Sequence, residues 1–196
     1  MIGSAEHTLG PLYMDEIIPE EKLPIRYAGY SPAFRREAGS YGKDTRGIWR
    51  MHHFDKMEME TFVKPEEGIA EQDFIIAIQE HFLSLLGLPY QAVIISTGEM
   101  GFPDHRQFDM EVWMPGQSAY RETTTSDYMG GFQARRLNTR LKRADGSIEH
   151  VHMNDATMVA MGRTLAAILE NYQESDGTVR IPKALQAFVG KDIIGK

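Results

Sequence analysis

The chain has 196 residues, of which 42% are hydrophobic and 25% are charged, values typical of a single globular domain. It contains no cysteine, which excludes disulfides and thiolate zinc sites, and its formal net charge of −7 argues against a domain that coats nucleic acid by itself. Because it has neither a bilayer-length hydrophobic run nor a signal-peptide pattern, we expect a cytoplasmic protein with no membrane partner.

The N-terminal residues 1–6, MIGSAE, carry no signal of their own, and the residues alone indicate a frayed terminus. Three prolines within residues 7–30 argue against a long helix there. Residues 23–30 are predicted to lead in extended conformation into the first strand.

Residues 34–60 are predicted to form two strands around a polar, glycine-bearing loop at 38–44. Arg35 and Glu37 are two positions apart, so on a strand their side chains face the same side. In the second strand, alternate positions bring cations, an aromatic ring and a carboxylate to one face: Arg50, His52, Phe54, Lys56 and Glu58. Such a face suits a ligand with a nucleotide at one end and a small polar group at the other. However, the alternation of charged residues by itself favours another interpretation, a solvated hairpin with cross-strand ion pairs.

Residues 70–86 show the first clear helical pattern, because apolar residues recur every three or four positions: Phe74, Ile75, Ile78, Phe82, Leu85 and Leu86. Gly87 and Pro89 are predicted to end this helix. Residues 91–96 form a short apolar run that indicates a buried strand.

The second half of the chain is predicted to hold several strands. Residues 108–113 alternate like a strand, and 118–125 indicate a threonine-rich edge strand. We expect a loop at 127–131 and a further strand at 132–136, on which the two adjacent arginines face opposite sides.

The C-terminal part is predicted to hold a hairpin and a second helix. The hairpin joins 138–142 to 147–153 through an Asp-Gly turn. The helix is expected over 154–173, with Asp155 as its N-cap and Arg163 interrupting its apolar face.

Several of these stretches resemble a known family. FRREAGSYGKDTRGIWRMHHFDKMEM, at 34–59, resembles motif 2 of class II aminoacyl-tRNA synthetases, in the form found in seryl-tRNA synthetases. ATMVAMGRTLAAILENYQ, at 156–173, resembles motif 3, and FQARR, at 132–136, matches the family sequence as it stands. SAE, at 4–6, resembles the family's serine-binding Thr-Ala-Glu loop with Ser for Thr. The resemblance implies one catalytic domain over 1–196, with motif 2 at 34–60 and motif 3 at 155–173. It also implies an α+β fold in which helices flank an antiparallel sheet, the catalytic fold of this class, present in part.

The resemblance implies an enzyme that activates L-serine with ATP to seryl-adenylate and transfers the seryl group to tRNA(Ser), with Mg²⁺ as cofactor. Arg35 and Arg163 are expected to carry catalysis. The residues expected to bind ATP are Arg35, Arg36, Glu37, Met51, His52, His53, Phe54, Glu122, Thr123, Thr124, Thr125 and Arg163. Within that set, Phe54 and Arg163 would sandwich the adenine ring, and Glu122 and Thr125 would hold Mg²⁺.

The residues expected to bind serine by the same resemblance are Ser4, Ala5, Glu6, Arg35, Glu58 and Thr157. Glu58 would accept the serine hydroxyl, so that alanine is rejected. Asp155 stands where the family usually has Asn, which places an additional negative charge near the substrate. His52 and His53 are adjacent on a strand and face opposite ways, so a zinc pair is not expected.

Two other functions are compatible with the sequence. One is a non-catalytic synthetase-like paralogue that binds ATP or seryl-adenylate, and the other is a ligase that charges an acceptor other than tRNA. Members of the family carry an N-terminal tRNA-binding arm and motif 1, which forms the dimer interface, ahead of the region resembled here. We therefore expect tRNA(Ser) binding and the homodimer in the full-length context, and a disordered start around residues 4–6.

Overall fold

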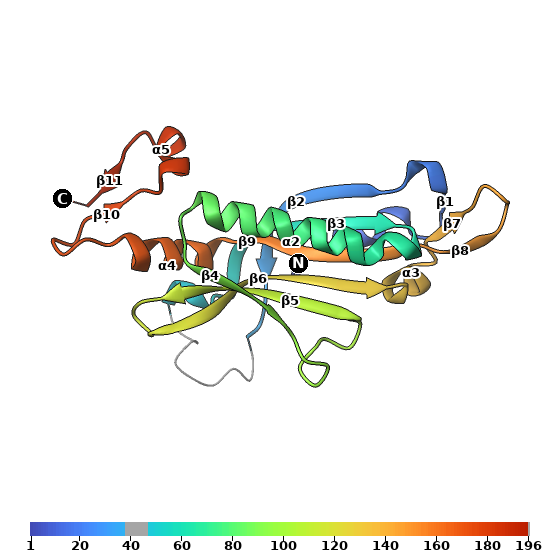
Figure 1. Ribbon diagram of the computed structural model, residues 1–196, viewed down its shortest axis with the longest axis horizontal. Helices are drawn as coiled ribbons and strands as arrows, with labels where there is room; N and C mark the ends of the chain where they lie inside the picture. Colours follow the sequence, from blue (N-terminus) through green and yellow to red (C-terminus); the bar gives the residue numbers. More distant parts are fainter. Residues whose placement is uncertain (38–46, 196) are drawn as a thin grey trace.

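The protein is organised around a six-stranded sheet with the strand order β2-β3-β9-β6-β5-β4 (Figure 1). The structure is a computed structural model that describes residues 1–37 and 47–195. Every neighbouring pair in this sheet is antiparallel, which confirms the predicted sheet type. The strands are β2 (Ile25–Phe34), β3 (His53–Val63), β4 (Tyr90–Ile94), β5 (Arg106–Met114), β6 (Ala119–Gly130) and β9 (His152–Ala160).

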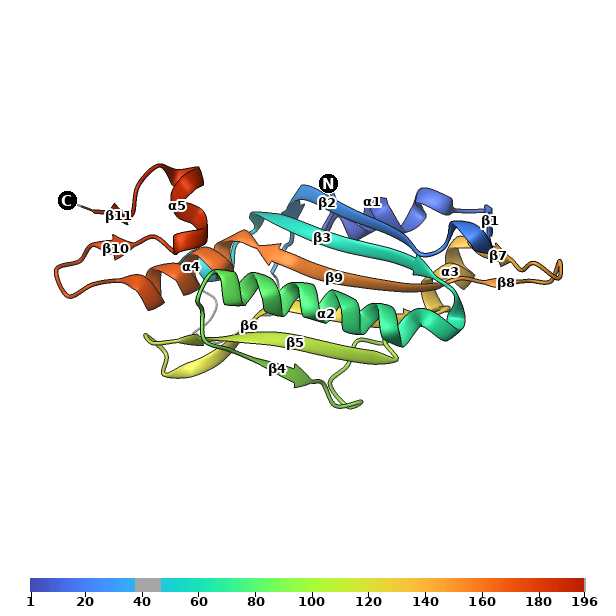
Figure 2. The same cartoon turned by 45° about the horizontal axis from the view of Figure 1, so that its top comes forward.

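Helix α2 (Gly68–Leu85) lies lengthwise over one face of the sheet (Figure 2). Its buried Ile75 packs with Met59 and Ala156 from the sheet, as the predicted apolar stripe requires. Gln79 is also buried, and its Nε2 donates to the carbonyls of Thr125 and Thr157 at 3.0 and 2.8 Å. These carbonyls lie just past the point where the register of β6 against β9 ends, so α2 satisfies the backbone groups that the separating strands leave unpaired.

Helix α4 (Met161–Tyr172) follows β9 directly and continues its direction. Ala166, Ala167 and Ile168 of α4 share a hydrophobic core with α2 and with β5. The prediction of one helix over 154–173 with Asp155 as its N-cap is therefore wrong in its first third. Residues 153–157 of β9 are all buried, so its sequence lacks the alternation that marks a half-buried strand.

The N-terminal segment is ordered against the sheet, which corrects the expected disordered start. Ser4 and Ala5 are 3% and 2% exposed, and α1 (Glu6–Leu9) and the 3-10 helix η1 (Gly10–Tyr13) follow them. Gly29 allows this close approach, because a Cβ there would lie 2.8 Å from Cδ1 of Leu9.

Four further expectations of local structure are wrong. Residues 132–137 form helix α3 (Phe132–Leu137), which ends at Asn138 with φ of 55°, and 127–130 belong to β6. The threonine-rich strand is central, since β6 lies between β9 and β5. The apolar run at 91–96 lies mostly in β4, which is the outermost strand and is largely exposed.

The remaining elements are short. The predicted hairpin forms as β7 (Arg140–Lys142) and β8 (Ile148–His150), and β1 (Ile17–Pro19) extends it to three strands. The other pieces are η2 (Glu20–Lys22), η4 (Gly47–Trp49), η5 (Pro65–Glu67), β10 (Val179–Arg180), α5 (Lys183–Val189) and β11 (Ile193–Ile194). Within the described part of the chain, no helix is long and apolar enough to cross a membrane.

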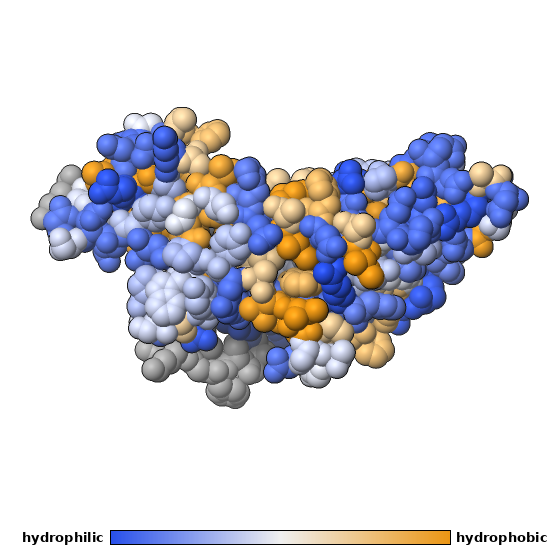
Figure 3. All heavy atoms as spheres, viewed as in Figure 1, coloured by the Kyte–Doolittle hydropathy of each residue, from blue (hydrophilic) through white to orange (hydrophobic). Residues whose placement is uncertain are grey.

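Hydrophobic side chains gather in the middle of the face that α2 covers (Figure 3). Phe74 and Leu85 of α2 and Ile94 of β4 are between 47% and 63% exposed. This exposed face lies opposite the polar side of the sheet, where the candidate site is found.

Candidate functional site

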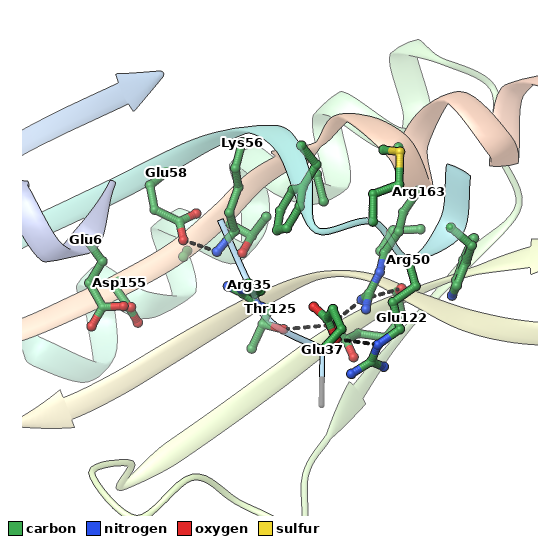
Figure 4. Close-up of a pocket in the computed structure, with 18 of the residues that line it drawn as sticks. Glu6, Arg35, Glu37, Arg50, Lys56, Glu58, Glu122, Thr125, Asp155 and Arg163 are labelled. Carbon is green, nitrogen blue, oxygen red and sulfur yellow. Dashed lines mark hydrogen bonds and ion pairs between the residues drawn. The ribbon is translucent and has the colours of Figure 1, made fainter. Parts of the chain in front are cut away.

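A polar cavity of about 270 Å³ lies on the face of the sheet turned away from α2. Its floor is formed by β3, β9 and β6. Its rim is formed by α1, residues 35–37, η4 and the start of α4. Figure 4 shows two groups of charged side chains, one at each end of this cavity.

Most of the predicted site residues line this cavity: Glu6, Arg35, Glu37, Met51, Phe54, Glu58, Glu122, Thr123, Thr125, Thr157 and Arg163. Six predicted residues do not line it: Ser4, Ala5, Arg36, His52, His53 and Thr124. Ser4 still contributes through Glu58, as described below. The ring of His53 stacks on Phe34 with centroids 4.6 Å apart, outside the cavity lining, and no group of described residues is arranged to hold a metal through three or more His, Asp or Glu side chains.

One end of the cavity holds paired cations and carboxylates. Arg163 Nη1 donates to Oε1 of Glu122 at 2.8 Å, and Arg50 Nε donates to Oε2 of Glu37 at 2.5 Å (Figure 4). The guanidinium of Arg163 lies over the ring of Trp49, 5.6 Å from its centroid. Two arginines held by carboxylates at a cavity rim provide forked donors for phosphate oxygens.

Phe54 and Arg163, which are expected to sandwich the adenine ring, both line the cavity, and each has a further stacking partner. The guanidinium of Arg35 lies 5.5 Å from the centroid of Phe54, whereas Arg163 stacks on Trp49. Trp49 comes close to α4 because position 162 is glycine, where a Cβ would lie 2.3 Å from the carbonyl oxygen of Ile48.

The oxygen donors beside Arg163 fit the predicted Mg²⁺. Thr125 Oγ1 lies 3.4 Å from Oε1 of Glu122, and Asp109 on the neighbouring strand has a buried Oδ1 without a hydrogen-bond partner among the described residues. Burial, and then the nearby Glu122, raise the pKa of Asp109 to about 6. Carboxylate and hydroxyl oxygens are the ligands that Mg²⁺ prefers.

The other end of the cavity is organised around Glu58, which is 2% exposed. Its Oε1 accepts hydrogen bonds from Ser4 Oγ, at 2.7 Å, and from Lys56 Nζ. Its Oε2 has no partner among the described residues, and Thr157 lies directly across from it on β9. A buried carboxylate oxygen held in place without a donor of its own is suited to accept a hydrogen bond from a ligand.

A row of carboxyl groups crosses the sheet next to Glu58. Glu60, Asp155 and Asp127 lie directly opposite one another on β3, β9 and β6, and Glu6 lies beside Asp155 (Figure 4). Burial, and then the neighbouring carboxylates, raise the pKa of Asp127 to about 8 and that of Asp155 well above its usual range. Burial and these neighbours therefore disfavour the negative charge expected from Asp155.

This row makes stability depend on pH. An unfolded aspartate loses its proton near pH 4, whereas folded Asp127 keeps its proton up to about pH 8, so the folded state binds more protons between these values. The free energy of unfolding is therefore expected to fall as the pH rises from about 4 through 8. Asp127→Asn removes this contribution. The free energy of unfolding of the variant minus that of the wild type is therefore expected to be about 1–3 kcal/mol larger at pH 8.5 than at pH 6. Urea unfolding of both proteins at the two pH values measures the difference, and parallel pH profiles would contradict it.

Residues 1–172 match the family of the tRNA synthetase class II core domain (G, H, P, S and T). The chain belongs to this family. The serine–tRNA ligase of Cenarchaeum symbiosum is 47% identical over 195 residues, which are 99% of this chain and 46% of that protein. The serine–tRNA ligase of Fervidobacterium nodosum is 44% identical over 194 residues, which are 99% of this chain and 46% of that protein. This chain of the class II core family thus spans slightly less than half the length of these relatives.

Solved structures show the same fold in class II synthetases. The seryl-tRNA synthetase of Pyrococcus horikoshii, complexed with ATP, superposes with a TM-score of 0.95 at 43% identity over 99% of this chain and 44% of that chain. The cytoplasmic serine–tRNA ligase of Naegleria fowleri, in complex with AMP, superposes with a TM-score of 0.93 at 34% identity over 99% of this chain and 46% of that chain. The α+β class II fold, present in part, is confirmed.

Sequence reasoning missed several residues that line the cavity. Lys56 and Asp127 belong to alternating strand patterns, Trp49 comes directly before Arg50, and Gln107 lies one strand further across the sheet. The alternation of 50–58 did contain the signal for Lys56, since it placed that residue on the same face as Glu58. Asp127 was missed because β6 was expected to end two residues earlier.

Proposed function

We propose that this chain is the catalytic core of a serine–tRNA ligase, which activates L-serine with ATP and passes the seryl group to tRNA(Ser). Its membership of the class II core family and its similarity to serine–tRNA ligases support this proposal. Serine is proposed as the amino acid because the buried Oε2 of Glu58 has no hydrogen-bond partner among the described residues. The hydroxyl of serine would supply the missing donor, and alanine would leave this oxygen unpaired.

The proposed first step joins the two ends of the cavity. A carboxylate oxygen of serine attacks the α-phosphorus of ATP, the bond from that phosphorus to the bridging oxygen of the β-phosphate breaks, and pyrophosphate leaves. Arg35 lies between the two ends and is proposed to hold the serine carboxylate and the α-phosphate, and Arg163 is proposed to hold the γ-phosphate. The transfer step then requires attack of a terminal tRNA hydroxyl on the seryl carbonyl, with AMP as the leaving group.

Several other predicted residues are proposed to keep their roles at one of the two ends. Mg²⁺ would neutralise charge on the phosphates, held by Glu122 with Thr125 beside it. Ser4 acts by fixing Glu58, and Thr157 and Glu6 complete the serine end. We also propose motif 2 at 34–60 and motif 3 at 155–173, of which 38–46 lie outside the described residues. tRNA(Ser) binding, the homodimer and action in the cytoplasm are proposed for the full-length context.

Exchange of labelled pyrophosphate into ATP tests the activation step. Exchange is expected to depend on L-serine and not to occur with L-alanine, because only serine carries the donor that Glu58 accepts. Threonine serves as a control for size, since it keeps the hydroxyl and adds one methyl group. Equal exchange with alanine and serine would refute Glu58 as the group that recognises the hydroxyl.

A further inference from the structure

The row of carboxyl groups next to Glu58 exceeds what one ammonium group neutralises. Glu60, Asp155 and Asp127 are direct cross-strand neighbours, whose Cβ atoms lie about 5 Å apart in such pairs. Glu6, on α1, brings a fourth carboxyl group to Asp155 (Figure 4). Like charges directly opposite one another destabilise a sheet, so this arrangement needs positive partners or bound protons.

No cation in the described part of the chain forms an ion pair with this row, although the charge of Lys56 lowers the pKa of Asp127. Asp155 is 8% exposed, lines the cavity, and has an Oδ1 without a hydrogen-bond partner in that part of the chain. Oδ1 of Asp127 and both carboxyl oxygens of the fully buried Glu60 also have no hydrogen-bond partner among the described residues. Lys56 forms an ion pair with Glu58, and Glu6 accepts a hydrogen bond from the neutral amide of Gln133, at 2.5 Å.

The chemistry of the row favours an organic amine over a metal ion. No group of three or more described His, Asp or Glu side chains has an arrangement that holds a metal. The α-ammonium group of an amino acid substrate would satisfy one carboxylate of the row. Two carboxyl groups that face the cavity, among Glu6, Asp127 and Asp155, then remain for a second cation.

We propose that the cavity also accepts and activates a short diamino acid, whose side-chain ammonium group binds this row of carboxyl groups instead of donating to Glu58 as the serine hydroxyl would. The proposal rests on the proposed function for the sites of ATP and of the substrate carboxylate. Two ammonium groups on adjacent carbons are separated by three bonds, a span that suits carboxyl groups on adjacent strands. Activation follows the same step as for serine: the carboxylate oxygen attacks the α-phosphorus, pyrophosphate leaves, and both amines remain unreacted.

The test compares L-2,3-diaminopropionate with L-serine, two molecules that differ by an ammonium group in place of a hydroxyl. Each is titrated calorimetrically into the chain saturated with a non-hydrolysable ATP analogue, and each is also assayed for pyrophosphate exchange. The wild-type chain is expected to bind diaminopropionate at least as tightly as serine. Asp155→Asn and Asp127→Asn are each expected to lower the ratio of diaminopropionate affinity to serine affinity at least tenfold.

Glu21→Gln provides the matched control, because it removes one negative charge from an exposed side chain on η2, away from the cavity. This variant is expected to keep the wild-type ratio. Thermal unfolding of each variant verifies that it folds, and a ratio of two affinities measured on the same protein is independent of its active fraction.

Each outcome decides the proposal. Binding of serine without diaminopropionate would overturn it and leave the proposed function intact, and an unchanged ratio in both aspartate variants would also overturn it. Binding of diaminopropionate without serine would support the carboxyl row as an amine site and overturn serine as the substrate. Binding of neither amino acid in the presence of the nucleotide would overturn both.

Discussion

Glu58→Ala is expected to abolish serine-dependent pyrophosphate exchange, by at least about a hundredfold, while ATP binding changes little. The carboxylate is buried between Ser4 and Lys56, and its free Oε2 faces the end of the cavity where the serine hydroxyl is proposed to bind. Removal of the carboxylate leaves the hydroxyl without an acceptor and Lys56 without its ion-pair partner. Calorimetric titration with ATP, and exchange assays with serine, measure the two effects separately.

Glu58→Gln provides the matched control for shape. It keeps an oxygen acceptor for the hydroxyl but removes the charge that pairs with Lys56, so an intermediate loss of exchange is expected. The folded fraction of each variant is measured first by thermal unfolding, because an unpaired buried lysine lowers stability. Full exchange activity in folded Glu58→Ala would remove Glu58 from the serine site.

Arg163→Ala is expected to weaken ATP binding about 10- to 100-fold, with a much smaller effect on AMP. The guanidinium is one-quarter exposed at the end of the cavity opposite Glu58, where it lies over Trp49 and pairs with Glu122. Charge-assisted hydrogen bonds to phosphate contribute about 1.5–3 kcal/mol, and AMP lacks the phosphates that this arginine is proposed to hold. Calorimetric titration of both nucleotides gives the two affinities.

Arg163→Lys keeps the charge and loses the planar fork, so it is expected to recover part of the ATP affinity. The comparison with Glu58→Ala tests the division of roles between the two ends of the cavity. If the two alanine variants bind ATP with the same affinity, this division is wrong. If Arg163→Ala weakens AMP as strongly as ATP, the arginine does not act through the terminal phosphates.

The sequence predicted elements well where one face of an element is buried and the other is solvated. Helix α2 was placed within two residues at its start and one at its end, and β5 was recognised from alternation. Prediction failed in β9, whose residues 153–157 are all buried and which is followed directly by a true helix, α4. Its small and apolar residues fit a helical pattern as well as a strand, and only its pairing with β3 and β6 decides between them.

The candidate site was predictable residue by residue but not as an arrangement. Glu58 and Arg163 were found through resemblance, and both line the cavity. The row of Glu60, Asp155 and Asp127 was not found, because it depends on the register of three strands that are distant in sequence. Asp155 was noted as an unusual residue, yet the burial and the neighbouring carboxylates that raise its pKa depend on the folded arrangement.

The N-terminal segment is held by residues that are synthesised much later. Ser4 depends on Glu58, 54 residues further along the chain, and Glu6 depends on Gln133, 127 residues further along. On the ribosome, residues 4–6 therefore emerge before Glu58 and Gln133, while the β2–β3 hairpin and α2 can form from local contacts. The end of the cavity that holds Glu58 is completed only after α3 and β9 have emerged, so a nascent chain that stops before β9 lacks this end.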